Sequence, residues 1–134
     1  MKVLCIGDIH GRDDWKDKVN YALTHFVNKI IFIADYVDSF DIDPCEILYN
    51  LKEIIEYKKK YPEKIILLLG NHDYAYVFGY SNISGYNYTI QYDYKQLFQE
   101  NWDLFDIAWV ILLLKENIHY LLMQVYLIYI IKIT

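Results

Sequence analysis

Arginine, cysteine, proline and glycine are all scarce in this chain of 134 residues, which has one arginine, two cysteines, two prolines and five glycines. The cysteines, Cys5 and Cys45, are too few for a disulfide framework, and this favours a reducing, cytoplasmic setting. Acidic residues outnumber basic ones, 18 against 13, for a net charge of −5. A nucleic-acid partner is therefore not expected, because binding one requires a basic surface.

Hydrophobic runs long enough to cross a membrane are also missing. Apolar residues fill 107–114 and 118–131, but Lys115-Glu116-Asn117 separate the two runs. A membrane-spanning helix needs about 18–20 consecutive apolar residues, and neither run reaches that length. We therefore expect no membrane association and predict strands, or a strand and a helix, in these runs. A membrane-anchored interaction protein stays open as an alternative that rests on these runs alone.

The first half of the chain alternates between buried strands and amphipathic helices. Three short segments, 2–7, 29–34 and 64–69, are apolar almost throughout, which predicts buried strands. Between them, apolar residues recur at helical spacing in 13–27 and 44–60. This alternation indicates an α/β fold with a mainly parallel sheet that helices cover on both faces.

Two further predictions concern element boundaries. Asp43 is suited to the N-cap of the second helix and Pro44 to its first position, and Pro62 lies just beyond its end. After the third strand, the tyrosine-rich stretch 80–92 predicts a loop and 93–106 a helix. We divide the chain into a core, 1–106, and an apolar tail, 107–134.

Polar side chains follow each of the three predicted strands. The carboxyl ends of parallel strands form one edge of the sheet, where ligands bind in such folds. Carboxylate, imidazole and amide oxygen together suit divalent ions such as Mn²⁺, Fe²⁺ or Zn²⁺. The residues are Asp8 and His10, then Asp35 and Asp38, then Asn71, His72 and Asp73. We read Asp73 as the N-cap of a short helix that follows it.

These strand-end segments resemble a known family. Gly7-Asp8-Ile9-His10-Gly11, Ala34-Asp35-Tyr36-Val37-Asp38-Ser39 and Gly70-Asn71-His72-Asp73 look like the first three motifs of the calcineurin-like metallophosphoesterases. The resemblance covers residues 1 to about 75 and is closest to the branch of Ser/Thr phosphoprotein phosphatases and dinucleoside polyphosphatases, including small phage enzymes. It implies the N-terminal half of an α/β/β/α sandwich, with the metal site at the carboxyl ends of the strands.

The resemblance also implies a role for each residue. The family hydrolyses phosphomonoesters or phosphoanhydrides with a water that two divalent metal ions activate. By resemblance, Asp8 and His10 would bind the first ion, Asp35 would bridge both ions, and Asn71 would bind the second. His72 would be the general acid that protonates the leaving oxygen, and Asp38 would orient it. A phosphorylated substrate is the partner implied.

Three substitutions depart from the family pattern. Ala34 stands where glycine is usual, and Ser39 stands where the protein phosphatases carry an arginine. Arg12, the only arginine, is therefore the one candidate for a phosphate-binding guanidinium. Asp73 replaces the glutamate typical of phosphoprotein phosphatases, and this favours a more general phosphoesterase.

The family also has three later histidines, whereas only His119 follows His72 in this chain. The alternative is therefore an inactive, truncated or frameshifted fragment that binds one metal ion or a partner. Its tail would be strands of a truncated second sheet, with self-association through exposed apolar surface, or out-of-frame sequence. A frameshift near 110–122 would restore a His-Ala-Gly segment, provided that Leu122 is encoded by CTC and Gln124 by CAG, which the gene sequence would show.

Overall fold

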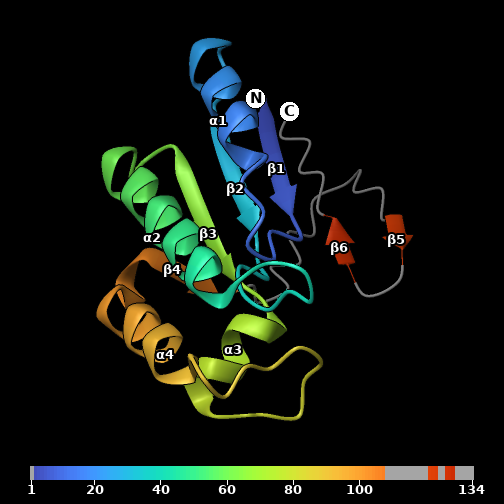
Figure 1. The fold of residues 1–134 in the computed structure, drawn as a ribbon. Coiled ribbons are helices and arrows are strands. Elements are labelled where there is room, and N and C mark those ends of the chain that lie inside the picture. The colour runs from blue at the N-terminus through green and yellow to red at the C-terminus, as the bar shows by residue number, and fades with distance from the viewer. Residues whose placement is uncertain (1, 108–120, 124–125, 129–134) are drawn as a thin grey trace.

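The computed structural model describes residues 2–107, 121–123 and 126–128. Its centre is a parallel sheet in the order β1-β2-β3-β4, formed by β1 (Val3–Gly7), β2 (Lys29–Ile33), β3 (Ile65–Leu69) and β4 (Phe105–Ile107). All four strands point to the same end of the sheet (Figure 1). The predicted α/β fold and its three strands are thus confirmed, with β4 added as a fourth. The prediction that all three are buried is wrong for β1, which lies at the edge of the sheet and has only Ile6 buried.

Three helices pack on one face of this sheet, namely α1 (Trp15–Thr24), α2 (Pro44–Lys60) and α4 (Gln91–Glu100). The ring of Trp15 meets Phe32 of β2 and Tyr57 of α2, with centroids 5.5 and 5.2 Å away. Phe98 of α4 meets Phe105 of β4 at 5.3 Å. A fourth helix, α3 (Asn71–Phe78), lies beyond the carboxyl ends of the strands (Figure 1).

The strands alternate between two environments, because successive side chains of a strand point to opposite faces. Ile30 and Phe32 of β2 face the helices and are fully buried, whereas Ile31 and Ile33 lie on the other face and are half-buried. The described helices α1, α2 and α4 therefore cover one face, where the sequence predicted helices on both. Continuous apolar runs cannot distinguish these cases, since isoleucine suits a half-buried face equally well.

Helix α2 begins and ends where the sequence predicts. The Asp43 carboxylate accepts the backbone N–H of Cys45 at 2.8 Å, and Pro44 is the first helical residue. Three lysines fill the last turn, where their charge favours the negative end of the helix dipole. The chain then turns at Tyr61, whose N–H bonds to the carbonyl of Tyr57.

The predicted helix 93–106 is wrong at its carboxyl end. Helix α4 stops at Glu100, a 3₁₀ turn η1 (Trp102–Leu104) follows, and Phe105 starts strand β4. Phe105 pairs in register with Leu67 and is buried between the rings of Tyr36 and Phe98. Helical spacing in the sequence cannot reveal this turn, because two of the residues that hold Phe105, Tyr36 and Leu67, come from distant segments.

Near the carboxyl end, β5 (Leu121–Met123) and β6 (Tyr126–Ile128) form an antiparallel pair. This agrees with the strands predicted in the run 118–131. The rest of the apolar tail lies outside the described residues. So does the segment 110–122, in which a frameshift is hypothesised, apart from residues 121 and 122. No helix in the described part of the chain is long and apolar enough to cross a membrane.

We expect Asn50→Ala to lower the free energy of unfolding by about 2 kcal/mol, because it leaves a buried indole N–H without a partner. The Asn50 side chain accepts from Trp15 Nε1 at 2.9 Å and donates to the carbonyl of Arg12 at 3.0 Å. Urea unfolding measures the loss. The exposed neighbour variant Lys52→Ala should stay within about 0.5 kcal/mol of the wild type, and equal losses in both variants would contradict this role.

Candidate metal centre

The loops that follow β1 and β2 bring two carboxylates and an imidazole together. Asp8, His10 and Asp35 each offer one ligand atom, and these atoms lie within 4.8 Å of one another. Asp35 is buried, His10 is half-buried and Asp8 is exposed, so the group opens to solvent on one side. A hard or borderline divalent ion fits such a donor set. These are the two first-ion ligands and the bridging ligand that the family resemblance implies.

Two backbone hydrogen bonds join these loops. The N–H of His10 donates to the carbonyl of Asp35 at 2.8 Å, and the N–H of Gly11 donates to that of Tyr36 at 3.1 Å. They hold together a backbone that is locally strained. Five of the six described non-glycine residues with positive φ lie here, namely Asp8 (53°), His10 (40°), Ala34 (61°), Asp35 (53°) and Asp38 (66°). Such left-handed residues are unfavourable and gather at functional sites.

The imidazole of His10 is oriented by backbone carbonyls. Its Nδ1 lies 3.0 Å from the carbonyl oxygen of Val37 and 2.8 Å from that of Asp38. Carbonyl oxygens only accept hydrogen bonds, so Nδ1 carries a proton, and in the neutral ring the lone pair is then on Nε2. A ring held in this way is ready to bind a metal ion through Nε2.

Asp73 holds the loop after β2 against the loop after β3. Its buried carboxylate accepts the N–H groups of Gly70 (2.9 Å), Asp35 (2.9 Å) and Tyr36 (2.8 Å). Burial raises the pKa of Asp73 to about 7; the bond from Gly70 opposes this rise, and the charge of Asp35 adds to it. Together the three bonds fix the backbone from which the Asp35 carboxylate projects.

The prediction that Asp73 is an N-cap is wrong. Gly70 is the N-cap of α3, and Asp73 is the third helical residue, whose carboxylate reaches back to the Gly70 N–H. The sequence signal for this is an acidic residue three positions after the cap. Sequence reasoning missed the further bonds to Asp35 and Tyr36, because they depend on how two distant loops meet.

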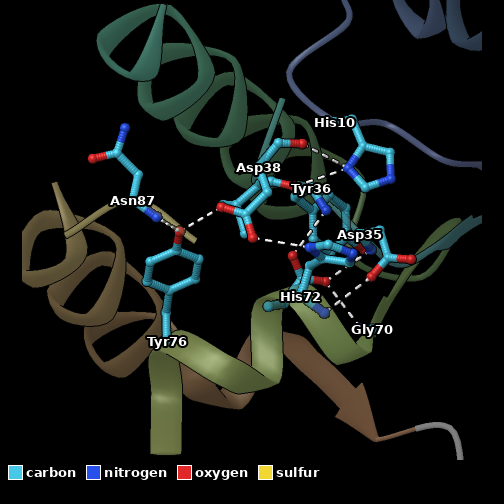
Figure 2. A network of polar contacts seen from close by, with 10 residues as sticks. His10, Asp35, Tyr36, Asp38, Gly70, His72, Tyr76 and Asn87 are labelled. Carbon is cyan, nitrogen blue, oxygen red and sulfur yellow. Dashed lines mark hydrogen bonds and ion pairs between the residues drawn. The ribbon is translucent and has the colours of Figure 1, made fainter. Parts of the chain in front are cut away.

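His72 and Asp38 form a hydrogen-bonded pair beside His10 and Asp35 of the candidate metal group (Figure 2). His72 Nδ1 lies 2.9 Å from Asp38 Oδ2, with side chains 16% and 2% exposed. Burial raises the pKa of Asp38, while hydrogen bonds from Tyr76 and His72 oppose the rise. The backbone N–H of His72 donates to Asp35 Oδ1 at 3.2 Å, and the rings of His72 and His10 meet edge to face at 5.2 Å.

Two further residues, Asn71 and Arg12, are predicted to belong to the site. Asn71 is the first residue of α3 and is exposed, directly after Gly70. It lines an open pocket of about 520 Å³ together with Tyr74 and Tyr80. Arg12 pairs instead with the exposed Asp41, at 3.2 Å. Any contact between Arg12 and phosphate would therefore have to compete with this ion pair.

A family comparison agrees with the geometry. The model of the family described as calcineurin-like phosphoesterase matches residues 1–130. The match extends well beyond the three strand-end motifs, the last of which ends at Asp73. No curated protein matches the chain significantly.

We expect Gly70→Ala to weaken metal binding about ten-fold or more, as the loss of other groups that orient a ligand does. A Cβ at Gly70 would lie 2.2 Å from Asp35 Oδ1 and 2.7 Å from Ala34 Cβ, so the Asp35 carboxylate would have to move. Calorimetric titration with Mn²⁺ measures the affinity. Gly7→Ala is the matched control, because its Cβ would meet Ile33 no closer than 3.7 Å. Equal affinity in both variants would contradict the prediction.

Proposed function

Because the chain belongs to the calcineurin-like phosphoesterase family, we propose that it hydrolyses phosphomonoesters or phosphoanhydrides at the strand-end site, with His72 as general acid. One observation carries the proposal. The His72–Asp38 pair adjoins the cluster of Asp8, His10 and Asp35, and the His72 backbone donates to the same Asp35 carboxylate. A phosphoryl group held at the cluster would thus have a proton donor beside it.

Asp8, His10 and Asp35 would hold the first divalent ion, and Asp35 and Asn71 the second, as Mn²⁺, Fe²⁺ or Zn²⁺. When bound, such ions neutralise phosphate charge and lower the pKa of an attacking water. Asp35 suits the bridging position, because its carboxylate has two oxygens and its backbone is fixed through Asp73. His10 suits a ligand position, because its Nδ1 proton is already bound to carbonyl oxygens.

His72 would donate a proton from Nε2 to the oxygen of the leaving group. Its Nδ1 is bound to Asp38, so the ring cannot turn and Nε2 is the nitrogen available to substrate. The carboxylate of Asp38 would also balance the positive charge of the protonated ring. General acids positioned in this way accelerate reactions by about 10²–10⁴-fold.

Within the family, we propose the branch of Ser/Thr phosphoprotein phosphatases and dinucleoside polyphosphatases, including phage-type enzymes. Two features favour a small substrate over a phosphoprotein. First, Asp73 replaces the glutamate expected from the resemblance. Second, Arg12 is the only arginine of the chain and pairs with Asp41, so no other arginine could bind a peptide phosphate. Parallel assays with a phosphoserine peptide and a dinucleoside tetraphosphate would distinguish the two substrate classes.

A second candidate is a protein that binds one ion and does not turn over substrate. Its support is the uneven ligand supply among the described residues, where three groups converge on the first ion and only Asp35 and Asn71 remain for the second. Calorimetry separates the candidates, because two ions per chain would favour the enzyme and one ion without hydrolysis would favour the binder. Size-exclusion chromatography would test self-association in the same samples.

We expect Mn²⁺-dependent hydrolysis of p-nitrophenyl phosphate that Asp35→Asn reduces to the level of the metal-free protein. The substitution removes the charge that holds the ions and an oxygen ligand from the bridge. The rate is measured by release of p-nitrophenol, with and without chelator. Asp93→Asn, on the exposed surface of α4, should behave as wild type. A folded wild-type protein that is inactive with Mn²⁺, Fe²⁺ and Zn²⁺ would refute the proposal.

His72→Gln should lower kcat far more for substrates with poor leaving groups than for those with good ones. A leaving group such as 2,4-dinitrophenolate departs without a proton, whereas phenolate needs one in the transition state. We expect a loss of about 10²-fold or more on phenyl phosphate, with a much smaller loss on 2,4-dinitrophenyl phosphate. Equal losses on both substrates would mean that His72 has another role.

A further inference from the structure

We propose that Tyr76 is a positioning residue for the His72–Asp38 pair, and that it connects this pair to the loop 80–90. The inference rests on the proposed function of His72. Tyr76 lies four residues after His72 in α3 and therefore on the same face of the helix. Its ring is buried, with 1% exposed, and its hydroxyl donates to Asp38 Oδ1 (Figure 2).

The direction of each hydrogen bond in this chain follows from the chemistry of its groups. The backbone N–H of Asn87 can only donate, and it lies 2.7 Å from the Tyr76 hydroxyl oxygen. The hydroxyl has one proton, which it gives to Asp38, since a carboxylate accepts. Burial and this bond to Asp38 raise the pKa of Tyr76, so the hydroxyl keeps its proton. Asp38 then uses Oδ1 for Tyr76 and Oδ2 for His72.

Both oxygens of Asp38 are therefore fixed, and this matters for His72. A carboxylate held at one oxygen can rotate about its side-chain bonds, and the imidazole bound to it would move as well. With Tyr76 at the second oxygen, Asp38 has one orientation, and Nε2 of His72 is held toward the metal ligands. The bonds from Asn87 to Tyr76 and from Tyr76 to Asp38 run in one direction, so each also strengthens the other.

Aromatic packing holds the Tyr76 hydroxyl in place. Its ring stacks on Tyr86 at 4.3 Å with planes 8° apart, and it meets the edge of Tyr94 at 5.0 Å. The loop also passes close to Asp38 itself, because a Cβ at Gly85 would lie 3.3 Å from Asp38 Cβ. The segment Gly85–Asn87 thus lies close to Asp38 and is also joined to it through Tyr76, although it lies outside the three motifs.

A purely structural Tyr76 predicts a different result from a positioning one. Loss of a structural hydroxyl would lower the activity on every substrate by the same factor, through a smaller folded fraction. Loss of a positioning hydroxyl would matter only where His72 must deliver a proton. Leaving-group dependence therefore separates the two roles.

The test uses the Mn²⁺-loaded full chain carrying Tyr76→Phe. We expect kcat to fall about ten-fold on phenyl phosphate, with little change on 2,4-dinitrophenyl phosphate and an unchanged KM. Tyr94→Phe is the matched control, because it removes another buried hydroxyl, one that donates to the carbonyl of Pro44 at 3.0 Å. It should affect both substrates equally. In a His72→Gln background, Tyr76→Phe should cause no further loss.

A second readout does not depend on turnover. In ¹⁵N-histidine-labelled protein, the Nδ1 proton of His72 should give a resonance that exchanges slowly with water. Tyr76→Phe should speed this exchange, and Tyr94→Phe should leave it unchanged. The inference is overturned if Tyr76→Phe leaves the exchange unchanged, or if it lowers both substrate rates by the same factor. An inactive wild type would refute the proposed function alone, and the exchange measurement would still decide the role of Tyr76.

Discussion

The site depends on one buried carboxylate, that of Asp73. It binds three backbone N–H groups and so holds the loop after β2 against the loop after β3. Burying a charge is costly, and burial raises the pKa of Asp73 to about 7; the backbone donors and the amino end of α3 offset part of that cost. These bonds, together with the one from the His72 N–H to Asp35 Oδ1, fix the distance between Asp35 and the start of α3. The position of His72 beside the candidate metal ligands follows from this junction.

The same junction explains why Gly70 and Ala34, where the two loops come closest together, are small residues. The Asp35 carboxylate lies where a Cβ of residue 70 would be, so only glycine fits there. Ala34 has a φ of 61°, a conformation that glycine adopts at no cost and alanine does not. The loops after β1 and β2 therefore store local strain that their mutual hydrogen bonds offset. Behind them, β1 pairs in register with β2 and β2 with β3, and these strands provide the rigid support.

The sequence predicted those parts of the molecule that short-range patterns determine. Continuous apolar runs located β1, β2 and β3, and the Asp43–Pro44 signal located the start of α2. Placing Asp8, His10 and Asp35 together needed only the rule that parallel strands end at one edge. The early end of α4, the carboxylate bonds of Asp73 and the contact from Tyr76 to Asp38 were not predictable, because each depends on segments more than thirty residues apart or on a local turn without a periodic signal.

His10 and His72 show how the surroundings, more than the residue type, assign a role. Their rings are 5.2 Å apart, and both bind Asp38 through Nδ1. His10 meets the backbone carbonyl of Asp38, a neutral acceptor that leaves its Nε2 lone pair free for a cation. His72 meets the side-chain carboxylate, whose negative charge can balance a ring that carries an extra proton. One aspartate thus supports the proposed metal ligand with its backbone and the proposed proton donor with its side chain. The left-handed φ of 66° at Asp38 belongs to the backbone that presents both groups at once.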